Sequence, residues 1–224
     1  MHTPIARNAF VALSVALALA SASAAGRDDR PQEPLVGLPC EGCEAAFEGL
    51  PAEVPTELVL WTETTPGVPM TVDGRVIDAA GNPRPDVLIY LHQTDGTGIY
   101  PAGAQTEGLG RDARRHGRLR GWVRSDSEGR YRIVTVRPGS YPEADIPEHI
   151  HMQVIEPGCA TYLVDDLLFR DDSKLTPDQE RQLARGTGGL GVVMPRRRIA
   201  GWEVTRDVVL GAGVPGYPEC GAGR

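Results

Sequence analysis

The sequence predicts an all-β protein, an antiparallel β-sandwich core with long loops and one short helix. The first observation is that 27 of the 224 residues are Gly and 19 are Pro, which favours short strands joined by turns. The second is a series of short apolar segments with no helices alternating between them, unlike a parallel-sheet protein. The hydrophobic fraction of 41% and the charged fraction of 24% fit a soluble globular core.

Residues 1–25 are expected to be a secretory signal peptide. Arg7 supplies a positive charge, residues 9–20 are apolar apart from Ser14, and Ala22-Ser23-Ala24 has the small residues of a cleavage site. The apolar run is shorter than the roughly 20 residues that a membrane span needs, and no later run approaches that length. We therefore expect a protein without a membrane span, in a periplasm or outside the cell.

The four cysteines are Cys40, Cys43, Cys159 and Cys220. An oxidising compartment favours disulfides over thiolate metal sites. The first two form a Cys-x-x-Cys motif, but neither a second pair nor histidines at zinc-ligand spacing accompany it. The sequence predicts structural disulfides and leaves their connectivity open.

Residues 26–70 are expected to form an N-terminal arm, which wraps the body of the protein, and a first strand at Glu57–Trp61. Residues 71–224 are expected to form one β-sandwich domain. Its strands are predicted at 70–77, 87–91, 122–125, 131–136, 151–155, 162–169 and 199–210.

Two of these strands, 122–125 and 131–136, are expected to pair as a hairpin around Asp126–Gly129.

Residues 101–120 form a Gly-rich and Arg-rich loop, and loops of that length tend to be functional or mobile. Thr176 and Pro177 are typical of the N-cap and first position of a helix, and this helix is predicted to end near Gly186.

The charge of the chain argues against a nucleic-acid partner. The formal net charge is −7, whereas phosphate binding needs a basic surface. The one basic cluster, Arg196–Arg198, is interpreted as a solvated loop or the guard of a sheet edge. The sequence indicates no oligomeric state.

A histidine pair and two tyrosines are the candidate functional residues. His149 and His151 are two residues apart, so an extended strand directs both imidazoles to one face. Tyr141 and Tyr100 each lie beside Gly and Pro turn residues. Either element alone is more often a surface pair or packing residues, but together they suit a trivalent ion such as Fe(III). The metal would have to drive deprotonation of phenols whose usual pKa is about 10.

The segment from Val72 to Phe169 resembles the intradiol ring-cleavage dioxygenases, which include protocatechuate 3,4-dioxygenase and catechol 1,2-dioxygenase. The likeness rests on the order and spacing of six motifs. These are Gly74-Arg75-Val76, Gly81-Asn82-Pro83, Val87 to Tyr100, Asp126 with Gly129-Arg130-Tyr131, Arg137 to Pro142, and His149-Ile150-His151.

The resemblance implies a β-sandwich that binds non-haem Fe(III) through Tyr100, Tyr141, His149 and His151. It also implies that a small aromatic diol and O2 are the substrates, and that the bond between the two hydroxylated carbons is cleaved. By its position in the family, Tyr141 is implied to leave the metal when the diol binds.

Two positions depart from the family pattern. Ile146 stands where the family usually has an Arg over the active site, and Asp166 falls where a family Gln faces the substrate. Loss of a cation and gain of an anion would change how a phenolate or carboxylate is stabilised. Arg137, or an Arg of residues 111–120, is expected to supply the missing charge, with Arg137 as the candidate catalytic cation beside Tyr141.

Two alternatives stay open from the sequence. One is a non-catalytic β-sandwich binding module that keeps the fold, with or without the metal. The other is a zinc site made of the two histidines with Asp145 or Glu148, although a strand would direct Glu148 away from the histidine face. The identity of the diol is not indicated.

Overall fold

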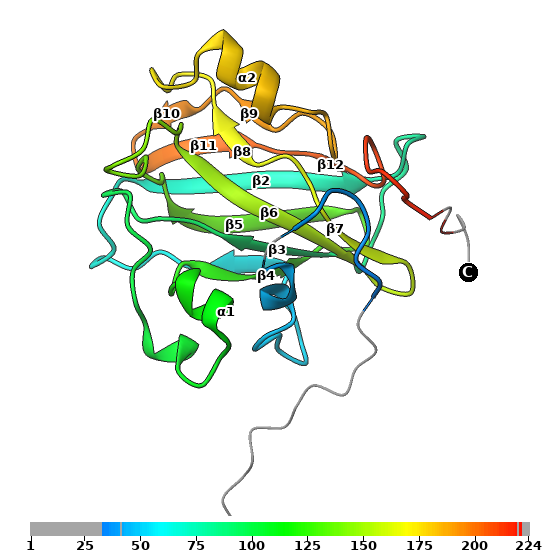
Figure 1. Ribbon diagram of the computed structural model, residues 1–224. Helices are drawn as coiled ribbons and strands as arrows, with labels where there is room; N and C mark the ends of the chain where they lie inside the picture. Colours follow the sequence, from blue (N-terminus) through cyan, green and yellow to red (C-terminus); the bar gives the residue numbers. More distant parts are fainter. Residues whose placement is uncertain (1–32, 41, 219, 221–224) are drawn as a thin grey trace, which may run out of the picture. The chain divides into compact units, whose positions relative to one another are not determined.

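Two six-stranded β-sheets form the framework of the described chain (Figure 1). The structure is a computed structural model that describes residues 33–40, 42–218 and 220. The expected signal peptide, residues 1–25, lies outside the described residues. Among the described residues, none of the helices is long and apolar enough to cross a membrane.

The first sheet has the strand order β1-β5-β2-β11-β10, with β12 also paired to β2. Its strands are β1 (Glu57–Val59), β2 (Pro69–Ile77), β5 (Arg130–Val136), β10 (Arg196–Arg198), β11 (Gly201–Thr205) and β12 (Val208–Val209). The second sheet has the order β4-β3-β6-β8-β9, with β7 also paired to β6. Its strands are β3 (Leu88–His92), β4 (Arg120–Arg124), β6 (His149–Glu156), β7 (Ala160–Leu163), β8 (Leu167–Phe169) and β9 (Val192–Val193).

The predicted β-sandwich is confirmed, with antiparallel pairs at the centre of each sheet. β2 pairs antiparallel with β5, and β6 pairs antiparallel with β3, β7 and β8. Four further pairings are parallel: β1 with β5, β11 with β2, β12 with β2, and β8 with β9. The chain passes between the layers often enough to bring strands of the same direction together.

The predicted hairpin of residues 122–125 and 131–136 is wrong. The turn itself forms, with Gly129 N–H donating to the Asp126 carbonyl at 2.9 Å. However, β4 pairs with β3 and β5 pairs with β2, so the turn connects the two layers. The reason lies in β4, whose first four residues are buried. A strand that needs cover on both faces is better placed in the second sheet, whose outer face is covered in this region.

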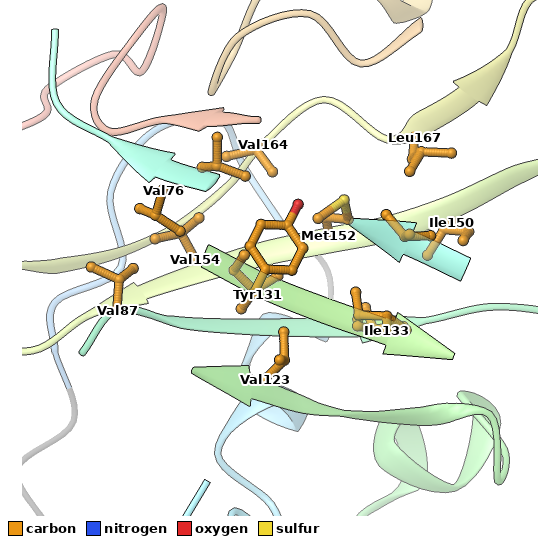
Figure 2. Packing of buried hydrophobic residues seen from close by; sticks show 14 of the residues in the cluster. Val76, Val87, Val123, Tyr131, Ile133, Ile150, Met152, Val154, Val164 and Leu167 are labelled. Carbon is orange, nitrogen blue, oxygen red and sulfur yellow. The ribbon is translucent and has the colours of Figure 1, made fainter. Parts of the chain in front are cut away.

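The main core lies between the two sheets and follows the alternation of the strands. In β2, Met70, Val72 and Val76 are at most 1% exposed, whereas the alternate residues Thr71, Asp73 and Arg75 are half-buried or exposed. Figure 2 shows the same apolar layer at Val76, Val123, Ile133, Met152 and Leu167. Each large apolar side chain buried in this way contributes about 1.5–3 kcal/mol.

A second, smaller core forms outside the β3–β4 pair. The 3-10 helix η1 (Cys43–Ala46) and the residues after it cover Tyr90 and Trp122, whose indole Nε1–H donates to the Ala46 carbonyl at 2.7 Å. The N-terminal arm therefore supplies core residues as well as wrapping the body. This cover is what allows β3 and β4 to be buried on both faces.

The helices partly follow the prediction. α2 (Pro177–Leu183) begins at Thr176, whose hydroxyl accepts from Gln179 N–H at 3.3 Å in a capping box. Residues 101–120 also contain the 3-10 helix η2 (Ala104–Thr106) and the helix α1 (Arg111–Arg115), which the sequence did not indicate. α1 has only five residues and no side-chain cap, so it leaves little periodic signal.

The arginine cluster forms the exposed edge strand β10. All three arginines are exposed, and Arg198 pairs with Glu203 of the neighbouring strand at 2.7 Å. This placement agrees with the interpretation as a sheet-edge guard.

The structure settles the disulfide connectivity that the sequence left open. Cys40 pairs with Cys43, and Cys159 pairs with Cys220. The first bond closes a sequence separation of 3 residues and the second closes 61. The second bond ties the C-terminal segment to the start of β7.

We expect the double variant Cys159→Ser, Cys220→Ser to lose about 2–5 kcal/mol of unfolding free energy, because the long loop gains most entropy in the unfolded chain. The matched variant Cys40→Ser, Cys43→Ser should lose about 2 kcal/mol or less, since its loop is short. Urea denaturation under non-reducing conditions measures both. An equal loss in the two variants would show that loop entropy does not set the difference.

Candidate metal centre

The strand β6 fixes the direction of the two histidines. Ile150 and Met152 are each 2% exposed and point into the main core, so alternation directs His149 and His151 to the outer face of the sheet. Their Nε2 atoms are 3.1 Å apart. A shift of one residue in register would turn both imidazoles toward the main core and the two apolar residues away from it.

The two tyrosines reach the histidines from two loops that contact each other closely. Tyr100 follows β3, and Tyr141 lies between β5 and β6. Thr94 Oγ1 donates to the Gly139 carbonyl and Gly139 N–H donates to the Asp95 carbonyl, both at 2.8 Å. These bonds hold the Tyr100 loop against the Tyr141 loop.

Gly98 makes this close approach possible. Its φ is +83°, and a Cβ at this position would lie 2.0 Å from the Ser140 carbonyl oxygen. The position therefore requires both the left-handed conformation and the missing side chain of glycine. The backbone of one tyrosine loop passes directly over the backbone of the other.

The four candidate ligand atoms meet at one point on the outer face. The Tyr100 and Tyr141 hydroxyls are 2.8 Å apart, and the Tyr141 hydroxyl is 3.2 Å from His149 Nε2 and 3.4 Å from His151 Nε2. Neighbouring ligands that each lie roughly 2.1 Å from one ion are separated by about 3 Å. The structure thus brings together all four residues that the sequence predicted.

The Nδ1 atoms of both histidines have partners on the side away from the tyrosines, so both Nε2 lone pairs are directed at this point. His149 Nδ1–H donates to the Pro147 carbonyl at 2.7 Å, and His151 Nδ1 lies 3.1 Å from Asp166 Oδ1. Such partners on the far nitrogen fix the tautomer and the ring orientation of metal-binding histidines. Asp166, which the sequence marked only as a departure from the family, has this orienting position.

The pKa shifts oppose ionisation of the two candidate phenol ligands. Burial, together with the hydrogen bond to Tyr141, raises the pKa of Tyr100 far above its usual value. Burial also raises the pKa of Tyr141 and lowers that of His149. Burial opposes protonation of His151, but the Asp166 carboxylate outweighs it and raises the His151 pKa. Both phenols are therefore protonated unless a metal charge compensates.

The donor set fits a hard trivalent ion better than the zinc site considered from sequence. Glu148 Oε2 accepts from Arg137 Nε at 2.6 Å, and Asp145 is exposed. Asp166 is close enough to His149 and His151 for the three side chains to hold a metal together. However, its carboxylate contacts Nδ1 of His151, not the Nε2 atom that faces the tyrosines. Phenol oxygens and imidazoles are the atoms that meet, and these suit Fe(III).

Arg137 does not reach the cavity beside the four ligands. Its guanidinium binds Glu148 and forms two hydrogen bonds of 2.8 Å with Asp171. It also lies 5.0 Å from the ring centres of Phe169 and Trp202. The structure therefore places this candidate catalytic cation in a structural ion pair, next to the histidine strand. Ile146, at the position of the family Arg, is 40% exposed.

A cavity of about 250 Å³ opens beside the candidate ligands. It is lined by His92, Tyr100, Asp112, Arg115, His116, Tyr141 and His151. The sequence indicated that residues 101–120 form a functional or mobile loop, and an Arg of residues 111–120 was one candidate for the missing charge; Arg115 lines the cavity. The sequence did not single out His92, Asp112 or His116. A larger groove of about 710 Å³ lies near β9 to β12, and none of the four candidate ligands lines it.

The comparison with protein families agrees with this geometry. A family model described as "Dioxygenase" matches residues 46–187, which is more than half of the chain. The chain belongs to the intradiol ring-cleavage dioxygenase family. All four candidate ligands and Asp166 lie inside the matched segment.

A protein of this family matches part of the chain in sequence. The beta chain of protocatechuate 3,4-dioxygenase from Burkholderia cepacia is 32% identical over 117 residues, which cover 50% of this chain and 49% of the relative. The match therefore spans about half the length of that curated relative.

The solved structures that are similar to the chain include two dioxygenases. The dioxygenase domain of a dioxygenase and carbohydrate-binding protein fusion from Streptomyces sp. SirexAA-E has a TM-score of 0.53 and 28% identity, covering 72% of this chain and 91% of that chain. Catechol 1,2-dioxygenase from Acinetobacter sp. ADP1 has a TM-score of 0.53 and 20% identity, covering 73% and 61%. The second likeness concerns the fold alone.

We expect Gly98→Ala to weaken metal binding and stability, because the new Cβ would press the two tyrosine loops apart. The overpacking should cost about 1–3 kcal/mol beyond the conformational cost of alanine at positive φ. Gly108→Ala is the matched control, since Gly108 has φ +79° with nothing within 4 Å of its Cβ position. Thermal unfolding and Fe(III) titration compare the two, and equal behaviour would contradict the role of the loop contact.

We expect Asp166→Ala to lower metal affinity about 10- to 100-fold, because His151 loses the partner that orients its ring. Asp166→Asn keeps an oxygen acceptor at the same place and should lose less. Competitive titration with a chelator measures the affinity. If Asp166→Ala binds metal as tightly as the unchanged protein, Asp166 does not orient His151.

Proposed function

We propose that this protein is an exported non-haem Fe(III) dioxygenase that cleaves catechol-type diols between the two hydroxylated carbons with O2. The observation that carries the proposal is that two tyrosine hydroxyls and two histidine Nε2 atoms lie together, with contacts of 2.8 to 3.4 Å between them. Membership of the family supports the ring-cleaving chemistry. The choice of Fe(III) rests on the phenol oxygens, which are hard anionic ligands once deprotonated.

The residues of the site would have two roles, to bind the metal and to accept a proton from the substrate. Fe(III) bound there would supply the charge that stabilises the phenolates and the two oxygens of the diol. Tyr100, His149 and His151 would form the lasting part of the ligand set. Tyr141 lies against all three and lines the cavity, so its hydroxyl oxygen is placed to leave and to take up a proton from the arriving diol.

The cavity supports a small substrate with one ring. Its volume of about 250 Å³ is below the range of about 300–1,000 Å³ that is usual for drug-sized ligands. Tyr100, His92 and His116 line it with ring faces and edges, against which an aromatic diol can stack. Holding the diol in this slot would orient its two oxygens toward the ligand atoms.

Export is supported by two features of the chain. The N-terminal residues have the pattern of a secretory signal, and four cysteines form two disulfides among the described residues. Disulfides of this kind persist in oxidising compartments. The destination that we propose is a periplasm or the outside of the cell.

A non-catalytic binding module is the second candidate function. The observation that favours it is that neither expected position places a cation in the site. Ile146 stands where the family has an Arg, and Arg137 is bound by Glu148 and Asp171. Such a protein would bind the metal and the diol without turnover.

Iron-loaded protein is expected to absorb visible light through tyrosinate-to-Fe(III) charge transfer. Tyr100→Phe or His151→Ala should abolish the band, because each removes one of four ligands. Tyr217→Phe is the matched control: it removes a phenol that binds Glu156, away from the site, and should keep the colour. Full colour in Tyr100→Phe would show that the ligand is wrongly assigned.

Oxygen uptake with a catechol separates the two candidate functions. The dioxygenase should consume one O2 for each diol and yield an open-chain dicarboxylate, identified by mass spectrometry. Full iron occupancy without ring cleavage on catechol, protocatechuate and hydroxyquinol would favour the binding module. A colourless protein that neither holds iron nor consumes O2 would contradict both.

A further inference from the structure

A chain of hydrogen bonds begins at Arg120 behind the cavity. Arg120 is 7% exposed, and its Nη2 donates to the carbonyls of Ala45 and Glu48, each at 2.7 Å. Its Nε donates to the Tyr90 hydroxyl oxygen at 2.8 Å. Because a guanidinium only donates, the hydroxyl oxygen of Tyr90 is the acceptor in this bond.

The next bond fixes the tautomer of His116. The Tyr90 hydroxyl lies 2.7 Å from His116 Nδ1. Burial raises the pKa of Tyr90 to about 12, so the hydroxyl keeps its proton. Among the described residues His116 Nδ1 is the one acceptor within reach of that proton, so we assign Tyr90 as the donor in this bond. Burial, followed by the charge of Arg120, lowers the pKa of His116 to about 4, so the ring is neutral at pH 7. A neutral imidazole that accepts at Nδ1 carries its proton on Nε2.

His116 lies in the wall of the cavity with this donor unused. Its ring stacks on His92 with centres 3.5 Å apart, and His92 stacks on His151 with centres 4.5 Å apart. Within the described part of the chain, His116 Nε2 has no hydrogen-bond partner. His116 is thus separated by one intervening ring, that of His92, from the candidate metal ligand His151, and all three residues line the same cavity.

We propose that His116 Nε2–H binds an oxygen substituent on the far side of the diol ring, so that the preferred substrates are catechols bearing a carboxylate or a further hydroxyl. This inference rests on the proposed function and names its substrate class. Arg115 also lines the cavity, with Asp112 at 3.5 Å from its guanidinium, so an oxygen substituent meets a second donor there. His116 is a specificity-determining residue, and Arg120 and Tyr90 are positioning residues that act through it.

The tautomer is testable without metal. In metal-free protein labelled with ¹⁵N-histidine, NMR at pH 7 should show His116 with an unprotonated Nδ1 and a proton on Nε2. Tyr90→Phe should remove the fixed tautomer and give a mixture of the two. A proton on Nδ1 of His116 in the unchanged protein would overturn the inference.

The substrate class is tested by anaerobic titration of the iron-loaded protein, followed through the shift of its visible band. His116→Phe keeps the stacked ring but loses the donor, and should weaken binding of protocatechuate, hydroxyquinol or both about 10-fold relative to 4-methylcatechol. His116→Gln, which retains an N–H at a similar reach, should recover part of the preference. Glu107→Gln, exposed in the same segment and outside the cavity, is the control and should change none of the ratios.

The outcomes separate this inference from the proposed function. A loss confined to protocatechuate would identify a carboxylate as the substituent, and a loss confined to hydroxyquinol would identify a hydroxyl. Binding of all three diols with ratios unchanged by His116→Phe would overturn the inference and leave the dioxygenase standing. If no diol shifts the band at all, the proposed function falls and the inference falls with it.

Discussion

The contact between the two tyrosine loops is the constraint on which the candidate site depends. Residues 94–98 and 139–140 pass so close that Gly98 has no room for a Cβ beside the Ser140 carbonyl. Backbone and threonine hydrogen bonds then hold the loops in one arrangement. Neither tyrosine is on a strand, so this contact, rather than a regular element, sets the 2.8 Å distance between their hydroxyls.

The histidine half of the site depends on the core instead. Ile150 and Met152 are held in the main core, and the alternation of β6 then leaves no choice of face for His149 and His151. The small second core positions the residues behind the cavity wall. The carbonyls of Ala45 and Glu48 accept from Arg120, and Arg120 in turn donates to the Tyr90 hydroxyl. The site therefore lies where the outer face of one sheet is covered by loops and by the N-terminal arm.

The sequence could predict those parts that follow from local periodicity. The strand alternation gave the direction of His149 and His151, and the resemblance to a family added Tyr100 and Tyr141. The sequence could not show that β4 and β5 belong to different sheets, because that depends on cover supplied by residues about 75 positions away. For the same reason it missed His92 and His116, which meet only after folding. It also assigned a catalytic role to Arg137, whose guanidinium is bound by Glu148 and Asp171.

A crystal structure of the iron-loaded protein would test the central claim most directly, since it locates the metal and its ligand atoms together. We expect one ion bound by the hydroxyl oxygens of Tyr100 and Tyr141 and by Nε2 of His149 and His151, with Asp166 still on Nδ1 of His151. An ion bound by Asp166 with the tyrosines turned away, or an ion at any other place, would contradict the account.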